Sequence, residues 1–313
     1  MKEFRKHVAI AIDGGGIRGV IVTRALAKLE AHLHKPCHEI FRLTAGTSTG
    51  SIISAGIAAG LTAEQMYQLY VQLGPAIFRK TWRSFFWPLT RYRYSSQPLA
   101  DALRRHIGDK KMGDFWKADP KTDVVITAFD LVENRTRFIK PWKSEYKNWP
   151  VVTAVLASST IPTYFPVVEG RYVDGGVGSY ANPCYLAAYE LQFVLGWKPE
   201  ETTLISLGTG RDPRHVRVGE PSRYGALDWL EPLVGAFLRS ADDQQVHLVE
   251  TFFKKLDFRR FQVDLEEELP VDDPRSIPKL SVYGDEMGRM ILNDQYDRAL
   301  GVTPPRPAPA VPV

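Results

Sequence analysis

Cysteine is scarce in this chain of 313 residues: Cys37 and Cys184 lie far apart and lack the spacing of a metal site. This usage excludes a disulfide framework and fits a reducing compartment. Long hydrophobic runs are also lacking. The first apolar run, Val8 to Ile12, is short, and Ile52 to Leu61 cannot span a bilayer. We therefore expect no export signal and a cytoplasmic location. Peripheral contact with a membrane is compatible with this expectation.

Charge of one sign is scarce as well. The net charge of +4 is spread along the chain, which does not indicate a nucleic-acid partner but tolerates an anionic membrane surface. Apolar residues make up 44% and charged residues 24%, as in ordinary soluble globular proteins. No repeat or break in composition marks a second domain. We expect one domain over residues 1–302 and a disordered, proline-rich tail over 303–313.

The chain does contain alternating short strands and helices. Val8 to Ile12 predicts a buried strand, and apolar residues at helical spacing predict a helix from Val20 to about His34. A strand at 41–45 and a helix at 51–61 follow. These are consecutive β/α units of a mainly parallel sheet. Further strands are expected at 123–129, 134–140, 203–210 and 258–265, and further helices at 62–73, 98–107, 151–157, 182–193, 228–253 and 285–300.

The second strand runs into Gly46-Thr-Ser-Thr-Gly50. A serine between two glycines, where a strand turns into a helix, is called a nucleophile elbow. The turn is tight, and a Cβ at either glycine would collide with the neighbouring strand or helix. Ser48 would lie at the positive end of a helix, which stabilises a developing negative charge. The alternative is a glycine-rich turn with an incidental serine.

A glycine loop, Asp13-Gly-Gly-Gly-Ile-Arg-Gly19, follows the first strand. It formally matches the dinucleotide fingerprint, which also requires an acidic residue at the end of the next strand. That strand ends in Thr44-Ala45-Gly46, so the cofactor interpretation is disfavoured. Adjacent glycines leave backbone N–H groups bare at a helix N-terminus, which suits an oxyanion. If the two strands are neighbours, the loop faces Ser48.

Two further features are open to a catalytic interpretation. A short strand ends in Asp174-Gly-Gly176, a sequence that alone reads as a turn. Of seven histidines, His215 and His247 follow both Ser48 and Asp174, and only His215 lies in an expected loop, as an α/β-hydrolase triad would require; a solvated loop histidine is the preferred interpretation. A cluster of possible ligands near the end of the first helix lacks paired spacing, so no metal is expected there: His32, His34, Cys37 and His38.

Residues 80–94 hold six aromatic and four basic side chains and no acidic one. Rings and cations interleaved in this way suit the headgroup level of a bilayer. The alternative, which we prefer from the sequence, is a packed loop or cap over the sheet.

Taken in order, the glycine loop, the elbow and Asp174-Gly-Gly176 strongly resemble the signature of the patatin-like phospholipases. The stretches 157–166 and 206–210 are also similar to that family, and the resemblance is clearest from Val8 to Gly210. It implies a three-layer α/β/α fold with a mainly parallel central sheet, related to the catalytic domain of cytosolic phospholipase A. It also implies a Ser–Asp dyad in place of a triad.

By this resemblance Ser48 is the nucleophile and Asp174 the general base. The oxyanion hole would consist of backbone N–H groups of Gly14, Gly15, Gly16 and Thr49. Supporting positions of the motifs are Asp13, Arg18, Gly19, Gly46, Gly50, Gly175 and Gly176. Arg18 would face a phosphate or hold the loop.

The implied activity is hydrolysis of a fatty-acyl ester in a phospholipid or another acyl lipid, without metal or organic cofactor. Alternatives are transfer of the acyl group to another alcohol and, less favoured, a nucleotide-binding module that uses the glycine loop. The implied partners are the lipid and, through residues 80–94, a membrane surface. The sequence leaves oligomeric state, headgroup and chain length open.

Overall fold

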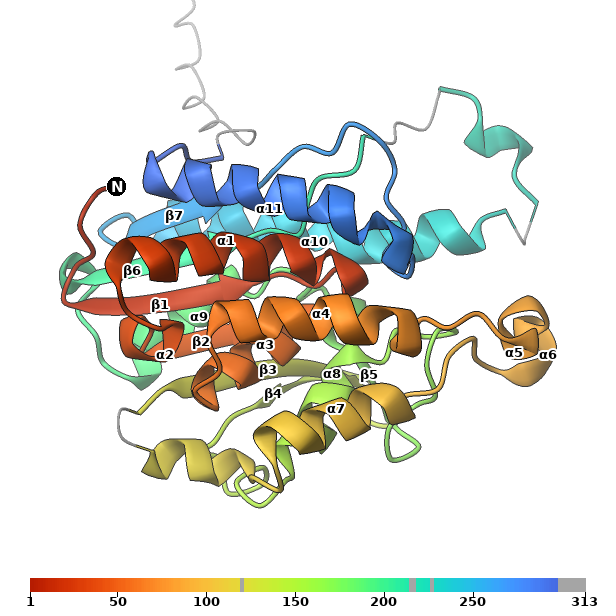
Figure 1. Ribbon diagram of the computed structural model, residues 1–313, viewed down its shortest axis with the longest axis horizontal. Coiled ribbons are helices and arrows are strands. Elements are labelled where there is room, and N and C mark those ends of the chain that lie inside the picture. The colour runs from red at the N-terminus through yellow and green to blue at the C-terminus, as the bar shows by residue number, and fades with distance from the viewer. Residues whose placement is uncertain (119–120, 214–217, 226–227, 298–313) are drawn as a thin grey trace, which may run out of the picture.

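A computed structural model describes residues 1–118, 121–213, 218–225 and 228–297 of the chain. The expected tail at 303–313 and His215 lie outside the described residues. Within them, a sheet runs in the order β4-β3-β2-β1-β6-β7, with β5 paired to β3 (Figure 1). The strands are β1 (His7–Ile12), β2 (Leu43–Gly46), β3 (Asp123–Asp130), β4 (Arg135–Ile139), β5 (Tyr172–Asp174), β6 (Thr202–Leu207) and β7 (Asp257–Phe261).

The sheet is mainly parallel, as expected. β1 pairs in parallel with β2 and β6, and the next strands outward, β3 and β7, continue the parallel order. The antiparallel pairs are β3–β4 and β3–β5. The β3–β4 pair is the hairpin that residues 134–140 predict. The carboxyl ends of β1, β2 and β6 therefore meet at one edge of the sheet.

Helices cover both faces of the sheet (Figure 1). On one face lie α1 (Gly19–Leu33), α3 (Thr49–Ala58), α4 (Ala63–Ile77), α7 (Gln97–Ile107), α8 (Val151–Ser159) and α11 (Ile277–Leu292). On the other lie α9 (Cys184–Tyr189) and α10 (Leu230–Phe252), and short helices occur at α2 (Cys37–Ile40), α5 (Trp82–Phe85) and α6 (Trp87–Thr90). The three-layer α/β/α arrangement is confirmed.

Strand β1 shows how the layers follow from the sequence. Val8, Ile10 and Ile12 pack in the core beneath α1, α3, α4 and α11. Ala9 and Ala11 alternate with them and pack on the opposite face with α9 and α10. Successive residues of a strand point to opposite faces, so a continuous apolar run indicates a strand covered on both sides. The alanines let the helices of the second face approach the sheet closely.

The last helix lies earlier than the sequence suggests: α11 spans Ile277–Leu292, whereas we expected 285–300. Pro278 lies in its first turn, where the missing N–H costs no hydrogen bond. Gly284 reads as a break in the sequence but lies at a helix contact. A Cβ there would come 2.6 Å from Cβ of Arg24 on α1. Close approach of the two helices, rather than a turn, explains this glycine.

Residues 80–94 were expected to form a packed loop or cap over the sheet, and among the side chains of this segment that the structure describes only that of Tyr94, at its end, is buried. Helices α5 and α6 project beyond the ends of α4 and α7 (Figure 1). Trp82 is 64% exposed and Leu89 83% exposed. In the described part of the chain, no helix combines the length and the apolar character needed to cross a bilayer.

Candidate active site

The glycine loop and the elbow lie side by side because their strands are neighbours. Ile12, the last residue of β1, pairs with Gly46, the last residue of β2. A Cβ on Gly14 would lie only 3.2 Å from Cβ of Ser48. The sequence-based expectation that the loop faces the elbow is therefore correct. A side chain at position 14 would crowd the serine.

Ser48 lies at the N-cap of α3 with φ 55° and ψ −123°, a strained conformation for a residue with a side chain. A Cβ on Gly46 would collide with the carbonyl group of Gly50, and a Cβ on Gly50 would collide with the carbonyl oxygen of Ile12. Both glycines are thus required by close backbone approach, for the reason that the sequence suggests.

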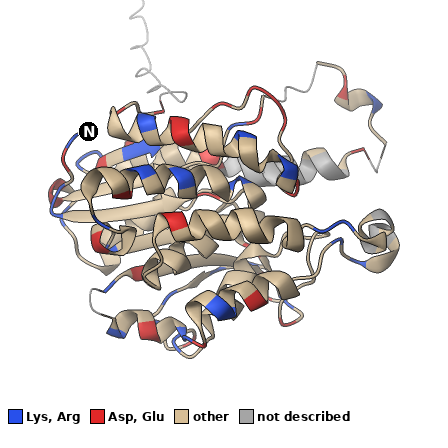
Figure 2. Ribbon diagram, in the orientation of Figure 1, with Lys and Arg blue, Asp and Glu red and all other residues tan. Residues whose placement is uncertain are grey.

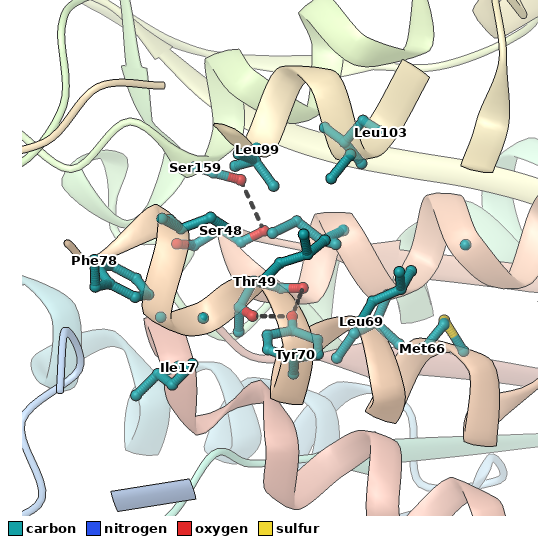
Figure 3. A pocket seen from close by; sticks show the side chains of 18 of the residues that line it. Ile17, Ser48, Thr49, Met66, Leu69, Tyr70, Phe78, Leu99, Leu103 and Ser159 are labelled. Carbon is teal, nitrogen blue, oxygen red and sulfur yellow. Dashed lines mark hydrogen bonds between the residues drawn. The ribbon is translucent and has the colours of Figure 1, made fainter. Parts of the chain in front are cut away.

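Three serines hold the backbone of Ser48 in this conformation, and Figure 3 shows one of them, Ser159. The Ser48 N–H donates to Oγ of Ser158 at 2.9 Å. The Ser48 carbonyl oxygen accepts from the hydroxyl of Ser51 at 2.6 Å and from that of Ser159 at 3.2 Å. Sequence reasoning gave Ser158 and Ser159 no role, although they lie in the stretch 157–166 that resembles the family.

We expect Ser158→Ala to destabilise the elbow. It leaves the buried N–H of Ser48 without an acceptor, which costs ~1–3 kcal/mol in the free energy of unfolding. kcat should fall with KM nearly unchanged, because the serine moves while the apolar pocket stays. Denaturant unfolding and steady-state kinetics measure both. Ser159→Ala is the matched control, since the Ser48 carbonyl keeps its bond from Ser51. Equal effects of the two variants would contradict this role for Ser158.

Asp174 reaches the same point from the antiparallel strand β5, opposite Ala128 of β3. Its side chain is fully buried, and Oδ1 accepts a hydrogen bond from the N–H of Gly176 at 2.8 Å. Oδ2 has no partner in hydrogen-bonding geometry among the described residues. Burial raises the pKa of Asp174 to about 6, while the Gly176 N–H and the nearby Ser48 hydroxyl lower it. A carboxylate with one unused oxygen next to a hydroxyl is equipped to accept a proton.

The backbone N–H groups of the loop are not equivalent. The N–H of Gly14 donates to the carbonyl oxygen of Ala181 at 2.9 Å, so the prediction that it serves the oxyanion hole is wrong. Within the described residues, the N–H groups of Gly15, Gly16 and Thr49 have no acceptor. These three remain the predicted donors to an oxyanion.

Residues from the C-terminal part of the chain hold the glycine loop. The hydroxyl of Thr209, after β6, donates to the carbonyl oxygen of Gly14 at 2.6 Å. Gly16 has φ 56°, and a Cβ there would collide with the carbonyl oxygen of Val271. Nε of Arg18 donates to the carbonyl oxygen of Leu269 at 2.7 Å. Of its two expected roles, the structure gives Arg18 the one of holding the loop.

Asp13, at the start of the loop, forms a buried ion pair with Arg260 of β7, the shorter distance being 2.6 Å. Arg260 also contacts Asp242 at 2.7 Å, and Asp242 accepts a hydrogen bond from Asn182. Burial raises the pKa of Asp13 to about 7, although Arg260 opposes the shift. The network ties the loop to strand β7 and helix α10.

An apolar pocket opens at Ser48 between α3, α4 and α7 (Figure 3). Its volume is about 90 Å³. The lining residues of α3 run from Thr49 to Gly56, so the pocket extends ~10 Å along that helix at 1.5 Å per residue. Most of its walls are aliphatic or aromatic, including Ile17, Ile52, Met66, Leu69, Leu73, Phe78, Leu99 and Leu103. Such a pocket suits a hydrocarbon chain whose polar end remains at Ser48.

The remaining expected positions have structural surroundings of their own. A Cβ on Gly19 would collide with the hydroxyls of Thr49 and Tyr70, and one on Gly175 with Thr127. Gly176 supplies the N–H that holds Asp174. In the part of the chain that the structure describes, no group of three or more histidine, cysteine, aspartate or glutamate side chains is placed to hold a metal ion.

Known proteins resemble this chain over much of its length. The family model described as patatin-like phospholipase matches residues 10–188. Patatin-like protein 1 of Oryza sativa subsp. indica is 29% identical over 290 residues, which cover 75% of this chain and 67% of that protein. The cGAMP-activated phospholipase of Pseudomonas aeruginosa is 27% identical over 309 residues, with coverages of 94% and 89%.

Among solved structures, VipD from Legionella pneumophila aligns with a TM-score of 0.50 at 11% identity, covering 93% of this chain and 67% of that one. At this identity the likeness concerns the fold alone. The family match covers more than half of the chain and contains the glycine loop, the elbow and Asp174. The chain therefore belongs to the patatin-like phospholipase family and is a lipid-ester hydrolase.

Proposed function

We propose that the chain cleaves fatty-acyl esters through a covalent acyl-enzyme on Ser48, with Asp174 as general base. The supporting observation is the meeting of a buried, proton-accepting carboxyl group and an elbow serine at the mouth of an apolar pocket. A serine hydroxyl is a weak nucleophile and needs such a base. With a pKa of about 6, Asp174 is ionised at neutral pH. This pKa is also near enough to neutral pH for efficient proton transfer.

In the first half of the reaction, Oγ of Ser48 attacks the ester carbonyl carbon while its proton passes to Asp174. The negative charge on the carbonyl oxygen is stabilised by the N–H groups of Gly15, Gly16 and Thr49. The C–O bond then breaks, and the alcohol leaves with the proton from Asp174. In the second half, Asp174 accepts a proton from water. The water oxygen attacks the acyl carbonyl carbon and the bond to Oγ of Ser48 breaks. Asp174 then returns its proton to Oγ, and the fatty acid leaves.

The substrate that this pocket favours is a phospholipid or another acyl lipid, with its acyl chain between α3, α4 and α7. Transfer of the acyl group to another alcohol would use the same acyl-enzyme and differs only in the acceptor. A nucleotide-binding module is disfavoured, because Val271 and Leu269 lie against the glycine loop where a pyrophosphate would bind. We further propose a single catalytic domain and a cytoplasmic protein that visits membranes.

A fluorophosphonate probe tests this assignment directly. We expect covalent labelling of the peptide that contains Ser48, identified by mass spectrometry, and loss of ester hydrolysis in proportion to labelling. Preincubation with phospholipid should slow labelling, and heat-denatured protein is the control for nonspecific reaction. Complete inhibition with the label on a different serine would contradict the proposal.

A further inference from the structure

The projecting segment carries large apolar side chains that are more than half exposed. In residues 79–93, here named the tip, Trp82 is 64% exposed, Phe86 57% and Leu89 83%. They belong to α5, to α6 and to the residue that joins them, at spacings of four and three residues. Large apolar side chains grouped on one projection mark an interaction site more often than a random part of a surface.

The charges of the tip are of one sign. Arg79, Lys80 and Arg91 are exposed, and no acidic residue occurs from residue 79 to residue 94. Figure 2 shows basic residues on the two segments that lead to and from α5 and α6. Two carboxylates lie near this segment: Asp272 contacts Arg93 at 4.0 Å, and the charge of Lys80 acts on Asp273. The exposed cations of the tip therefore complement an anionic surface.

The base of the tip is firmly attached to the body of the protein. The backbone N–H groups of Arg93 and Tyr94 donate to the carbonyl oxygens of Thr163 and Tyr164 at 2.9 and 2.8 Å. The Arg93 guanidinium lies 4.6 Å from the ring centre of Tyr164, and the Tyr94 hydroxyl donates to Asp272 at 2.8 Å. These contacts fix the base of the tip to the rest of the structure.

The base of the tip also borders the pocket of the active site. Phe78 and Tyr164 line that pocket. A second cleft, of about 530 Å³, lies between the tip and the body and is lined by Arg79, Trp82 and Arg93 among others. Ile77 lines both cavities. A lipid held at the tip is therefore close to an apolar route toward Ser48.

We propose that the tip docks on a bilayer that contains anionic phospholipid and so presents the pocket to its substrate. The apolar side chains enter the boundary between headgroups and acyl chains, while the exposed cations meet lipid phosphates. The acyl chain then passes into the protein without crossing water. A protein partner fits less well, because a stable interface takes about 20–30 residues a side, more than the tip offers.

The purpose of the docking rests on the proposed function, but binding can be measured without catalysis. Flotation of Ser48→Ala protein with vesicles avoids hydrolysis and keeps the two questions apart. We expect co-flotation with vesicles of phosphatidylcholine and phosphatidylglycerol, and weaker binding to phosphatidylcholine alone. Replacing Trp82, Phe86 and Leu89 by serine should lower the vesicle partition coefficient by up to ~10³-fold, since each buried apolar side chain contributes about tenfold.

A matched control replaces three equally exposed apolar residues away from the tip, Phe193, Phe252 and Val282, by serine. It should bind as the parent does, and thermal unfolding should verify that both triple variants fold. Replacing Arg79, Lys80 and Arg91 by glutamate should remove the preference for anionic vesicles. Equal binding of the two serine variants, or a parent protein that ignores anionic vesicles, would overturn the proposal. So would a tip-dependent protein dimer that forms without lipid.

Discussion

Ser48→Ala is expected to lower kcat for ester hydrolysis by ~10³-fold to 10⁶-fold, the range seen when a serine nucleophile is removed. Cβ of Ser48 lies beside the glycine loop, and the Ser48 hydroxyl is near enough to Asp174 to lower the pKa of that carboxyl. KM for a phospholipid should change little, since the pocket walls remain. Initial rates on a short-chain nitrophenyl ester and on phospholipid vesicles provide the measurement.

The matched control for this variant is Ser54→Ala. Ser54 lies in α3, and its buried Oγ has no hydrogen-bond partner among the described residues. Its removal deletes a hydroxyl from the same helix without touching the elbow, so the rate should stay near that of the parent. A Ser48→Ala enzyme that keeps a rate comparable to Ser54→Ala would remove the basis for an acyl-enzyme on this residue.

Asp174→Asn is expected to lower kcat by ~10²-fold to 10⁴-fold, the usual contribution of a positioned general base. The amide oxygen can still accept the N–H of Gly176, so the local backbone should be preserved. The amide cannot take the proton of Ser48. Labelling of Ser48 by the fluorophosphonate should slow in parallel with ester hydrolysis.

Asp174→Asn should lower the activity but not the free energy of unfolding. Burial raises the pKa of Asp174 from 3.8 to about 6 in the folded state. Below pH 3.8 the carboxyl is protonated in the folded and the unfolded state, so its burial does not lower the free energy of unfolding. As pH rises toward 6 the unfolded chain ionises first, and above pH 6 the penalty is complete, at ~3 kcal/mol. The asparagine variant should therefore be at least as stable as the parent at pH 8, as denaturant unfolding can measure.

The same pKa predicts the acid limb of the parent enzyme. kcat/KM for a soluble ester should fall about tenfold per pH unit below pH 6, because the base becomes protonated. This limb should be absent from the residual activity of Asp174→Asn. A variant that keeps the acid limb, or that retains parental activity, would assign the titrating base to another residue.

Much of the fold could be predicted from local patterns. Strands β1, β2, β3 and β6 are short apolar runs bounded by glycine or polar residues, and such runs reveal their type and order. The positions of Ser48 and Asp174 follow from local motifs, Gly-x-Ser-x-Gly for the first and Asp-Gly-Gly for the second. Helix α11 begins before the predicted residue 285 and includes Pro278 in its first turn and Gly284 at a helix contact, two residue types that favour breaks elsewhere.

Contacts between segments that lie far apart in the sequence could not be predicted. The N–H of Gly14 bonds to the carbonyl of Ala181, so only the return of the chain after β5 reveals that this donor is occupied. Ser158 supports Ser48 because α8 packs beside α3. The pairing of Asp13 with Arg260 requires β7 to lie on the far side of β6. None of these partners is marked by a local pattern.

Strand β6 has a consequence for the size of the working enzyme. The family match ends at residue 188, yet β6 lies between β1 and β7 in the sheet. Strand β7 contains Arg260, and Val271 lies in the chain after β7. A piece trimmed to the matched region would expose β1 as a bare edge, open to aggregation. It would also remove Val271 from beside Gly16 and leave the carboxylate of Asp13 without Arg260. The smallest functional unit thus reaches well past the segment that identifies the family.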